Sequence, residues 1–374
     1  MNKKMLAAVF TEIGHMEVKE VDSPEPTEDN IIIKVDACGI CGSDVRVFFN
    51  GSDSVKPPWI LGHEVAGTVL HIGKRAKEDF YIKNLNLKIN DRIILISTLS
   101  CGACEFCRTG RENLCINKGL TGYPPYPGGY AQYMPIVDIQ FKNIFKIPDN
   151  LSAILATLTD PLSDALHGIN ILDVNLGNKV LIIGSGPIGT MLAALSHLKG
   201  ASEIILTDIS DERLNLSKNA LSKFNRIEYY NVPKSLEEQE KYLRNILGED
   251  LPDRIIVASP SPEAQEYSLR LSKKGAKIVY FGGLPPSVKN IKFESNILHY
   301  GEQMILGSYA SKYEEQKLAL KLIVKNMIPA DKIINHISEL ENINESFNLI
   351  RSGKVLKVVI TPNEGRWKSF KNYF

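Results

Sequence analysis

KVLIIGSGPIG, residues 179–189, is the stretch that decides the fold. An apolar, strand-like run from Lys179 to Ile183 leads directly into glycines spaced as G-x-G-x-x-G, and a helical stretch follows. Glycines in this arrangement permit a tight turn, and they let a pyrophosphate approach the N-terminus of the helix. The expected contacts of such a dinucleotide are Gly184, Gly186, Pro187, Ile188 and Gly189.

Strands and helices alternate after this turn. Strand-like runs cover Glu203 to Thr207, Arg254 to Ala258 and Lys277 to Phe281, and a helical pattern covers Asp211 to Lys223. Such alternation is typical of a parallel sheet with helices on both faces. The sequence therefore predicts an α/β protein with a doubly wound, Rossmann-type domain.

The second strand-like run is followed by Asp208, about twenty residues after the glycines. A carboxylate at this place accepts hydrogen bonds from the adenosine ribose hydroxyls and repels a 2′-phosphate. NAD is therefore expected in preference to NADP. Arg213 lies near enough in the sequence to weaken that preference, or it faces solvent as an ordinary helix residue.

The sequence before and after this predicted domain shows a different pattern. Up to about residue 150 the sequence consists of short β-like runs, such as Ile31 to Val35 and Arg92 to Ile96, broken by glycine, proline and polar turns. This pattern predicts a β-rich domain. Lys74 to Lys88 is polar and lysine-rich with no clear period, which indicates a surface loop. After about residue 297 come two further helical stretches and a last strand, Lys357 to Ile360.

Composition narrows the class of partner. The chain has 374 residues, with 44 Lys and Arg against 43 Asp and Glu, so no net field would attract nucleic acid or an anionic membrane. Its length favours two domains. No run of about eighteen apolar residues occurs, and the N-terminus leads into a strand-like segment. We therefore expect a cytoplasmic protein that acts on a small molecule.

Six cysteines lie between Cys38 and Cys115, where metal ligation is a better explanation than disulfides. The string CGACEFCRTGRENLC has cysteine spacings of three, three and eight, so one tight loop can place four thiolates around an ion. Zinc is favoured because the site is closed and needs no redox partner; an iron–sulfur cluster is the alternative. The expected structural ligands are Cys101, Cys104, Cys107 and Cys115.

A second constellation lies upstream, in CGICGSD and GHE. Cys41 and His63 supply two ligands of the kind that a catalytic zinc uses beside an open position for substrate. The Ser43 hydroxyl, two residues after Cys41, can accept a proton from a zinc-bound alcohol. Taken singly, each residue also fits a plain structural role, as a buried thiol, a core histidine and a turn serine.

Together these motifs resemble the zinc-containing medium-chain alcohol dehydrogenase family, and within it the polyol and threonine dehydrogenase branch. The resemblance runs from about Met5 to Pro362 and includes GHEVAGTV at residues 62–69 and GGYAQY at residues 128–133. It implies that Cys41, His63 and Glu64 surround the catalytic zinc. It also implies that Phe281 and Gly282 line the nicotinamide end of the cofactor site.

Two positions depart from the branch pattern. Asp160, in TDPLSDALHG, stands where the branch has a glutamate ligand, and its shorter side chain binds zinc directly, binds it through a water, or only caps a helix. Arg46 stands where relatives often carry a relay histidine, and a guanidinium does not pass a proton. Arg46 instead faces either a substrate anion or solvent.

The resemblance implies the following organisation. Residues 1–155 form a GroES-like catalytic domain with a zinc lobe at about 98–120, residues 156–297 form the Rossmann domain, and residues 298–374 return to the catalytic domain. The implied activity is zinc-dependent oxidation of a secondary alcohol of a polyol or sugar derivative by NAD, with threonine or glucose as alternative substrates. A homotetramer or dimer is expected. A nucleotide-binding protein without catalysis is the alternative from another class.

Overall fold

The computed structural model describes residues 3–285, 287–288 and 290–363. The chain divides into two compact units: residues 1–163 together with 311–374, and residues 164–310. The first unit is therefore built from both ends of the sequence, and the second is inserted between them. Helix α6 (Thr159–Leu172) carries the chain from the first unit into the second.

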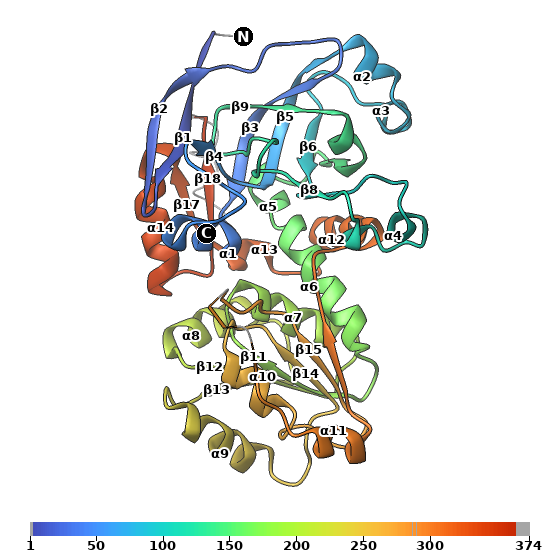
Figure 1. The fold of residues 1–374 in the computed structure, drawn as a ribbon, viewed down its shortest axis with the longest axis vertical. Helices are drawn as coiled ribbons and strands as arrows, with labels where there is room; N and C mark the ends of the chain where they lie inside the picture. Colours follow the sequence, from blue (N-terminus) through green and yellow to red (C-terminus); the bar gives the residue numbers. More distant parts are fainter. Residues whose placement is uncertain (1–2, 286, 289, 364–374) are drawn as a thin grey trace. The chain divides into compact units, whose positions relative to one another are not determined.

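The second unit is a parallel six-stranded sheet with helices, in the strand order β13-β12-β11-β14-β15-β16 (Figure 1). Its strands are β11 (Lys179–Ile183), β12 (Glu203–Asp208), β13 (Ile227–Asn231), β14 (Arg254–Val257), β15 (Lys277–Tyr280) and β16 (Met304–Gly307). The helices are α7 (Pro187–Leu198), α8 (Asp211–Ala220), α9 (Leu236–Leu247), α10 (Pro262–Ser268) and α11 (Ser295–Gly301). The predicted Rossmann-type α/β fold is confirmed.

Burial on both faces explains why these strands are continuous apolar runs. On one face Leu181, Ile205 and Ile255 are register partners, and on the other Ile182, Leu206 and Ile256 are; all six are at most 1% exposed. Such two-sided burial is the usual state of strands in a parallel sheet covered by helices.

The glycine turn of residues 184–189 joins β11 to α7. Gly184 adopts a φ of +110°, which strains any residue with a side chain, and Gly186 is the N-cap ahead of Pro187. A Cβ at Gly189 would lie 1.8 Å from the carbonyl oxygen of Gly184, so the helix can begin this close to the strand only with glycine there.

The first unit is built on an antiparallel β-rich core. The larger sheet has the order β10-β6-β5-β3-β18-β17, with β9 also paired to β3, and a smaller sheet has the order β2-β1-β4. These strands are β1 (Lys4–Glu12), β2 (His15–Asp22), β3 (Ile31–Gly39), β4 (Trp59–Ile60), β5 (Glu64–Ile72), β6 (Arg92–Leu95), β9 (Tyr133–Ile136), β10 (Ile144–Lys146), β17 (Ile334–Glu339) and β18 (Lys357–Thr361).

The two ends of the sequence meet in this larger sheet. β18 pairs antiparallel with β3, where Val359 faces Gly39 and Ile360 faces Cys38. Figure 1 shows these blue and red segments side by side. Aromatic side chains fill the core beside the sheet, since Phe48 and Phe347 stack with ring centroids 4.5 Å apart and both are fully buried. The C-terminal segment is thus part of the same hydrophobic core as the N-terminal one.

Short helices and a small hairpin complete the first unit. They are α1 (Gly42–Asn50), α2 (Lys74–Glu78), α3 (Phe80–Leu85), α4 (Glu105–Arg108), α5 (Ala153–Ala156), α12 (Tyr313–Val324), α13 (Ala330–Ile333), α14 (Ile343–Ser352), the 3-10 turns η1 (Glu112–Leu114), η2 (Asp138–Asn143) and η3 (Leu340–Asn342), and the strands β7 (Thr98–Leu99) and β8 (Gly119–Leu120).

The interpretation of Lys74 to Lys88 as a loop is wrong, because the segment forms α2 and α3. Asp79 begins the second helix, where its carboxylate accepts hydrogen bonds from the backbone N–H groups of Tyr81 and Ile82. Ala76 and Ile82 are buried in the core. Each helix is under two turns long, too short to show a helical period in the sequence.

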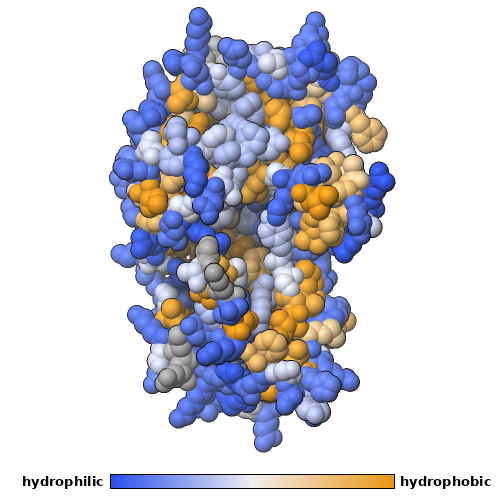
Figure 2. Space-filling view, viewed as in Figure 1, coloured by the Kyte–Doolittle hydropathy of each residue, from blue (hydrophilic) through white to orange (hydrophobic). Residues whose placement is uncertain are grey.

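The surface gives no sign of a membrane-spanning segment. In the residues that the structure describes, no helix combines the length and apolar character needed to cross a bilayer. On the face shown in Figure 2, hydrophobic side chains occur in patches among hydrophilic ones in both units. Scattered exposure of this kind is normal for a folded chain.

The contact at Gly189 predicts a stability difference between two alanine variants. Gly189→Ala should lower the free energy of unfolding by about 1–3 kcal/mol, because the added methyl group overlaps a backbone carbonyl. Gly186→Ala should cause no such loss, because its φ is −64° and no atom lies within 4 Å of the added Cβ. Denaturant unfolding of both variants checks this, and equal stability would contradict it.

Candidate metal and nucleotide sites

The N-terminus of α1 holds the first group of site residues. Cys41 is the N-cap of this helix, and Asp44 at the third helical position accepts a hydrogen bond from the Cys41 N–H over 3.2 Å. This capping box fixes the thiol and the carboxylate relative to each other. The CGSD motif therefore sets local geometry in addition to supplying a ligand.

Asp44 also holds the next group. Its Oδ1 lies 3.3 Å from His63 Nδ1, and its Oδ2 accepts a hydrogen bond from the Tyr130 hydroxyl over 2.9 Å. Both Asp44 and Tyr130 are fully buried. A carboxylate beside one ring nitrogen is the usual way to orient a metal-binding histidine, and it leaves Nε2 for the metal.

Electrostatics favour an ionised Asp44 next to a cationic partner. Burial alone would raise the pKa of Asp44, but the charge of His63 and hydrogen bonds to its carboxylate hold that pKa below its ordinary value. Burial would likewise lower the pKa of His63, yet the Asp44 and Cys41 charges raise it well above the ordinary value. The charges of Asp44 and His63 thus favour each other's ionised forms.

The backbone brings Glu64 beside these residues. Gly62 has a φ of +98°, and a Cβ there would lie 2.9 Å from Cys38 and Tyr130, so the GHE turn requires glycine at its first position. Glu64 then begins β5, and its side chain is buried. One ligand atom each of Cys41, His63 and Glu64 lies within 4.8 Å of the other two.

This group fits a catalytic zinc. It combines a thiolate, an imidazole and a carboxylate, which is a ligand set that zinc accepts with a fourth position left for substrate. Glu64 Oε2 is buried and has no hydrogen-bond partner, as expected of an oxygen that a metal ion would satisfy.

Lys357 is a buried member of the site that the sequence analysis missed. Its Nζ lies 2.5 Å from Glu64 Oε1 and donates a hydrogen bond to the carbonyl of Ile40 over 2.9 Å. Burial raises the pKa of Glu64 and Lys357 offsets part of that rise, whereas Glu64 and Cys41 raise the pKa of Lys357 against the effect of its burial. The sequence shows Lys357 only as the first residue of a strand.

Ser43 and Tyr123 lie beside the ligand group. The Ser43 hydroxyl is 3.5 Å from His63 Nε2, so it lies next to the expected metal position. Tyr123 is a hydrogen-bond partner of Ser43, and burial together with the Asp44 charge raises the pKa of its phenol. Tyr123 is a second residue that sequence reasoning missed.

Asp160 and Arg46 are the two residues that depart from the branch pattern. Asp160 lies in the first turn of α6, is 5% exposed, and accepts a hydrogen bond from the Ser97 N–H through Oδ1 over 2.9 Å. It is near enough to raise the pKa of Glu64 by charge repulsion, but it is not a member of the three-residue ligand group. Arg46 is exposed on α1. The ligand role of Asp160 stays a prediction.

The four cysteines of the lobe come together as expected for a closed metal site. The Sγ atoms of Cys104 and Cys107 are 3.5 Å apart, those of Cys101 and Cys115 are 3.5 Å apart, and those of Cys104 and Cys115 are 3.9 Å apart. Tetrahedral zinc with Zn–S bonds of about 2.3 Å needs S–S separations of about 3.8 Å. The six cysteines, all within the described residues, are free thiols.

Backbone donors stabilise part of this cluster as thiolate. Hydrogen bonds from the N–H groups of Ala103 and Cys104 lower the pKa of Cys101 to about 6. Lys142 contacts the carbonyl of Ser100 beside the cluster, where it balances negative charge. Glu112 accepts a hydrogen bond from the Tyr313 N–H over 2.7 Å and so ties the lobe to the start of α12.

The predicted nucleotide residues all belong to the second unit. Asp208 ends β12 and is 7% exposed; its Oδ2 accepts hydrogen bonds from the N–H and hydroxyl of Ser185, and its Oδ1 accepts one from the Ser210 N–H. The carboxylate is thus anchored to the glycine turn. Arg213 is half-buried on α8, and Phe281 and Gly282 directly follow β15.

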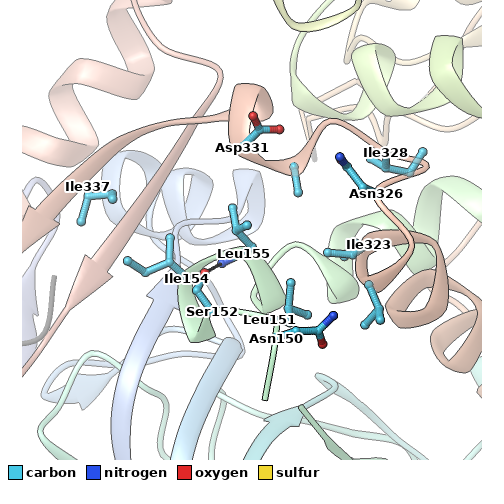
Figure 3. Close-up of a pocket in the computed structure, with 12 residues that line it drawn as sticks. Asn150, Leu151, Ser152, Ile154, Leu155, Ile323, Asn326, Ile328, Asp331 and Ile337 are labelled. Atoms are coloured by element: carbon cyan, nitrogen blue, oxygen red, sulfur yellow. Dashed lines mark hydrogen bonds between the residues drawn. The ribbon is translucent and has the colours of Figure 1, made fainter. Parts of the chain in front are cut away.

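A separate pocket of about 340 Å³ lies in the first unit (Figure 3). Apolar side chains from α5 and α12, including Ile154, Leu155 and Ile323, line it together with Asn326 and Asp331. None of the residues that line it is a member of either ligand group. This pocket is therefore separate from both candidate metal sites.

Comparisons with known proteins identify the family of the chain. Residues 27–149 match the family model described as the alcohol dehydrogenase GroES-like domain, and residues 187–325 match the model described as zinc-binding dehydrogenase. A sorbitol dehydrogenase from Bombyx mori is 31% identical over 366 residues, covering 95% of this chain and 97% of the relative. An L-threonine 3-dehydrogenase from Salmonella paratyphi B is 31% identical over 347 residues, covering 91% and 95%.

Solved structures show the same fold. A zinc-binding dehydrogenase from Sinorhizobium meliloti, bound to NADP, aligns with a TM-score of 0.84 at 27% identity and covers 96% of this chain and all of that one. An alcohol dehydrogenase from a Thermus strain aligns with a TM-score of 0.84 at 25% identity, with coverage of 96% and 100%.

Metal analysis should distinguish the two ligand groups. The purified protein is expected to contain about two zinc ions per chain, one removed readily by a chelator and one retained until unfolding. Cys41→Ser should reduce the content to about one, because it removes a ligand of the open site. Cys38→Ala is the matched control, since this buried cysteine belongs to neither group. Iron in place of zinc, or two zinc ions in Cys41→Ser, would contradict the assignment.

Proposed function

Because the chain belongs to the zinc-containing medium-chain alcohol dehydrogenase family, we propose that it oxidises a secondary alcohol of a polyol or sugar derivative with NAD. The reaction class, an NAD(P)-dependent zinc dehydrogenase, follows from the family. The observation that supports a working catalytic site is the group of the half-buried Cys41 and the buried His63 and Glu64.

These three side chains would hold the catalytic zinc. When bound, zinc would supply the Lewis acidity that makes an alcohol hydroxyl easier to deprotonate. The protein positions the ligands before the metal binds, since Asp44 fixes Cys41 through its backbone and lies against His63. Asp160 supports the same site in our proposal, either as a further ligand or through a water.

Ser43 is the group that we assign to proton removal. Its hydroxyl lies 3.5 Å from His63 Nε2 and interacts with Tyr123. A hydroxyl can accept the alcohol proton only while passing its own proton on, so a relay must lead away from Ser43. The raised pKa keeps the Tyr123 phenol protonated, and it helps hold the serine in place.

The relay cannot leave through Arg46. A guanidinium stays protonated and does not exchange a proton as an imidazole does. In our proposal the proton leaves Ser43 toward solvent through water. Arg46 is exposed on α1, where it is free to attract an anionic substrate group or to remain solvated.

NAD is the proposed cofactor, and when bound it accepts the hydride from the carbinol carbon. The Asp208 carboxylate is fixed at the end of β12 by Ser185 and Ser210, so its charge lies where a 2′-phosphate would be repelled. NADP is the alternative cofactor, because the similar protein from Sinorhizobium meliloti was solved with NADP bound.

The polyol assignment rests on the ligand set. CGSDV at residues 41–45, the Asp-Pro-Leu-Ser string that begins at Asp160, and a carboxylate in place of a third cysteine favour the polyol and threonine branch over simple alcohol dehydrogenases. The similar relatives named as sorbitol and threonine dehydrogenases keep both substrate classes open. Glucose is a further alternative. A homotetramer or dimer in the cytoplasm completes the proposal.

A nucleotide-binding protein without catalysis is the second candidate. The retained group of Cys41, His63 and Glu64 argues against it, because such a protein has no need for buried ligands aimed at one point. Turnover measurements separate the two candidates.

A substrate panel tests the proposed reaction. Polyols, sugar phosphates, threonine and glucose are incubated with NAD, and NADH absorbance is followed. We expect turnover of polyols with a secondary hydroxyl, with larger kcat/KM than threonine or glucose. Turnover of threonine alone would move the chain to the other substrate class. No turnover by zinc-loaded protein that binds NAD would support the non-catalytic candidate.

Cofactor selection should depend on the charge at Asp208. Asp208→Ala is expected to raise the kcat/KM ratio of NADP to NAD at least about tenfold, because a like charge no longer faces the 2′-phosphate. Asp208→Asn should shift the ratio in the same direction while retaining acceptors for Ser185. Asp211→Asn, an exposed acid on α8, is the control. An unchanged ratio in both Asp208 variants would overturn the ribose assignment.

A further inference from the structure

We propose that Lys357 is a positioning residue of the catalytic metal site, where it holds Glu64 by one oxygen and directs the other toward the metal. This inference rests on the proposed zinc site of Cys41, His63 and Glu64. It adds to that site a residue 293 positions away from Glu64 in the sequence.

The Lys357 ammonium contacts one proposed ligand, Glu64, and the backbone just before another, Cys41. Its Nζ lies 2.5 Å from Glu64 Oε1, and it donates a hydrogen bond over 2.9 Å to the carbonyl of Ile40, whose peptide leads into Cys41. The side chains of Lys357 and Glu64 are 4% and 0% exposed. Water therefore does not compete for this pair, and both partners are held more tightly than in a surface salt bridge.

The other carboxylate oxygen is left for the metal. Glu64 Oε2 is buried without a hydrogen-bond partner, which is costly unless an ion or another donor satisfies it. Gly39 provides the space around this oxygen, since a Cβ there would lie 2.0 Å from Oε2. The chain thus places a glycine where a side chain would push the free oxygen out of position.

The sheet fixes the place of the lysine. Lys357 begins β18, which pairs with β3 at Cys38 and Gly39, the strand that leads to Cys41. The backbone N–H of Lys357 donates to the Asn335 side chain over 3.3 Å. The ammonium therefore belongs to a strand paired with the strand that leads to Cys41.

The Lys357 ammonium also balances negative charge at the site. The site gathers the carboxyl groups of Asp44, Glu64 and Asp160, and Asp160 repels the Glu64 charge. One fixed cation lowers this repulsion while using only one oxygen of Glu64. An ion pair kept only for stability would make no demand on the second oxygen.

Metal affinity tests the proposal without using catalysis. The labile zinc of the full-length protein is titrated against a fluorescent chelator, and the dissociation constants are compared among variants. Lys357→Met should weaken labile zinc about 10–100-fold, as loss of a residue that orients a ligand does elsewhere. Lys354→Met, at an exposed lysine three residues earlier, is the matched control and should leave the affinity unchanged.

The coupling to Glu64 separates positioning from stability. In a Glu64→Gln background, adding Lys357→Met should change zinc affinity by less than about twofold, because the lysine acts through the carboxylate. Cobalt substitution gives a second reading, since the visible spectrum should change with Lys357→Met and show no further change in the double variant. A loss of the same size in both backgrounds would overturn the proposal, as would an unchanged affinity in Lys357→Met.

Lys357→Arg keeps the test decisive if the methionine variant does not fold. A guanidinium retains the charge but pairs with both carboxylate oxygens, so it should withdraw Oε2 and weaken zinc binding. Wild-type zinc affinity in this variant would contradict the one-oxygen arrangement. If the wild-type protein binds no labile zinc, both the proposed metal site and this inference are wrong. If it binds labile zinc with an affinity that does not change in the Lys357 variants, only this inference is wrong.

Discussion

The Asp44 carboxylate joins three parts of the chain at the candidate metal site. It accepts hydrogen bonds from the Cys41 N–H and the Tyr130 hydroxyl, and it lies 3.3 Å from His63 Nδ1. One buried anion thus sets the start of α1, the orientation of the histidine and the position of an aromatic core residue. The rest of the site depends on it, because ligands on separate segments must hold their geometry before a metal ion arrives.

A similar principle operates in the second unit. The glycine turn is fixed by close backbone contact at Gly189, and Asp208 is tied to Ser185 within that turn. The carboxylate that we assign to the ribose is therefore hydrogen-bonded to the turn that we assign to the pyrophosphate. In each unit a buried acid aligns neighbouring segments of the chain.

The sequence predicted those candidate site residues that belong to short local motifs. The lobe cysteines and the CGSD, GHE and G-x-G-x-x-G strings lie within short segments, and the structure gathers the members of each group. Lys357, Tyr123 and Tyr130 were not predicted, because their roles arise from pairing between distant strands and loops. Lys74 to Lys88 was misread because helices of five and six residues carry no period, and buried side chains such as Ile82 decide their structure.

The central claim is that Cys41, His63 and Glu64 bind one zinc ion beside an open coordination position. Anomalous X-ray diffraction at the zinc absorption edge tests it most directly. The account predicts two peaks per chain, one within the four-cysteine lobe and one about 2.0–2.3 Å from Cys41 Sγ, His63 Nε2 and Glu64 Oε2. A peak at the lobe alone, in protein purified without chelator and supplied with zinc, would contradict it.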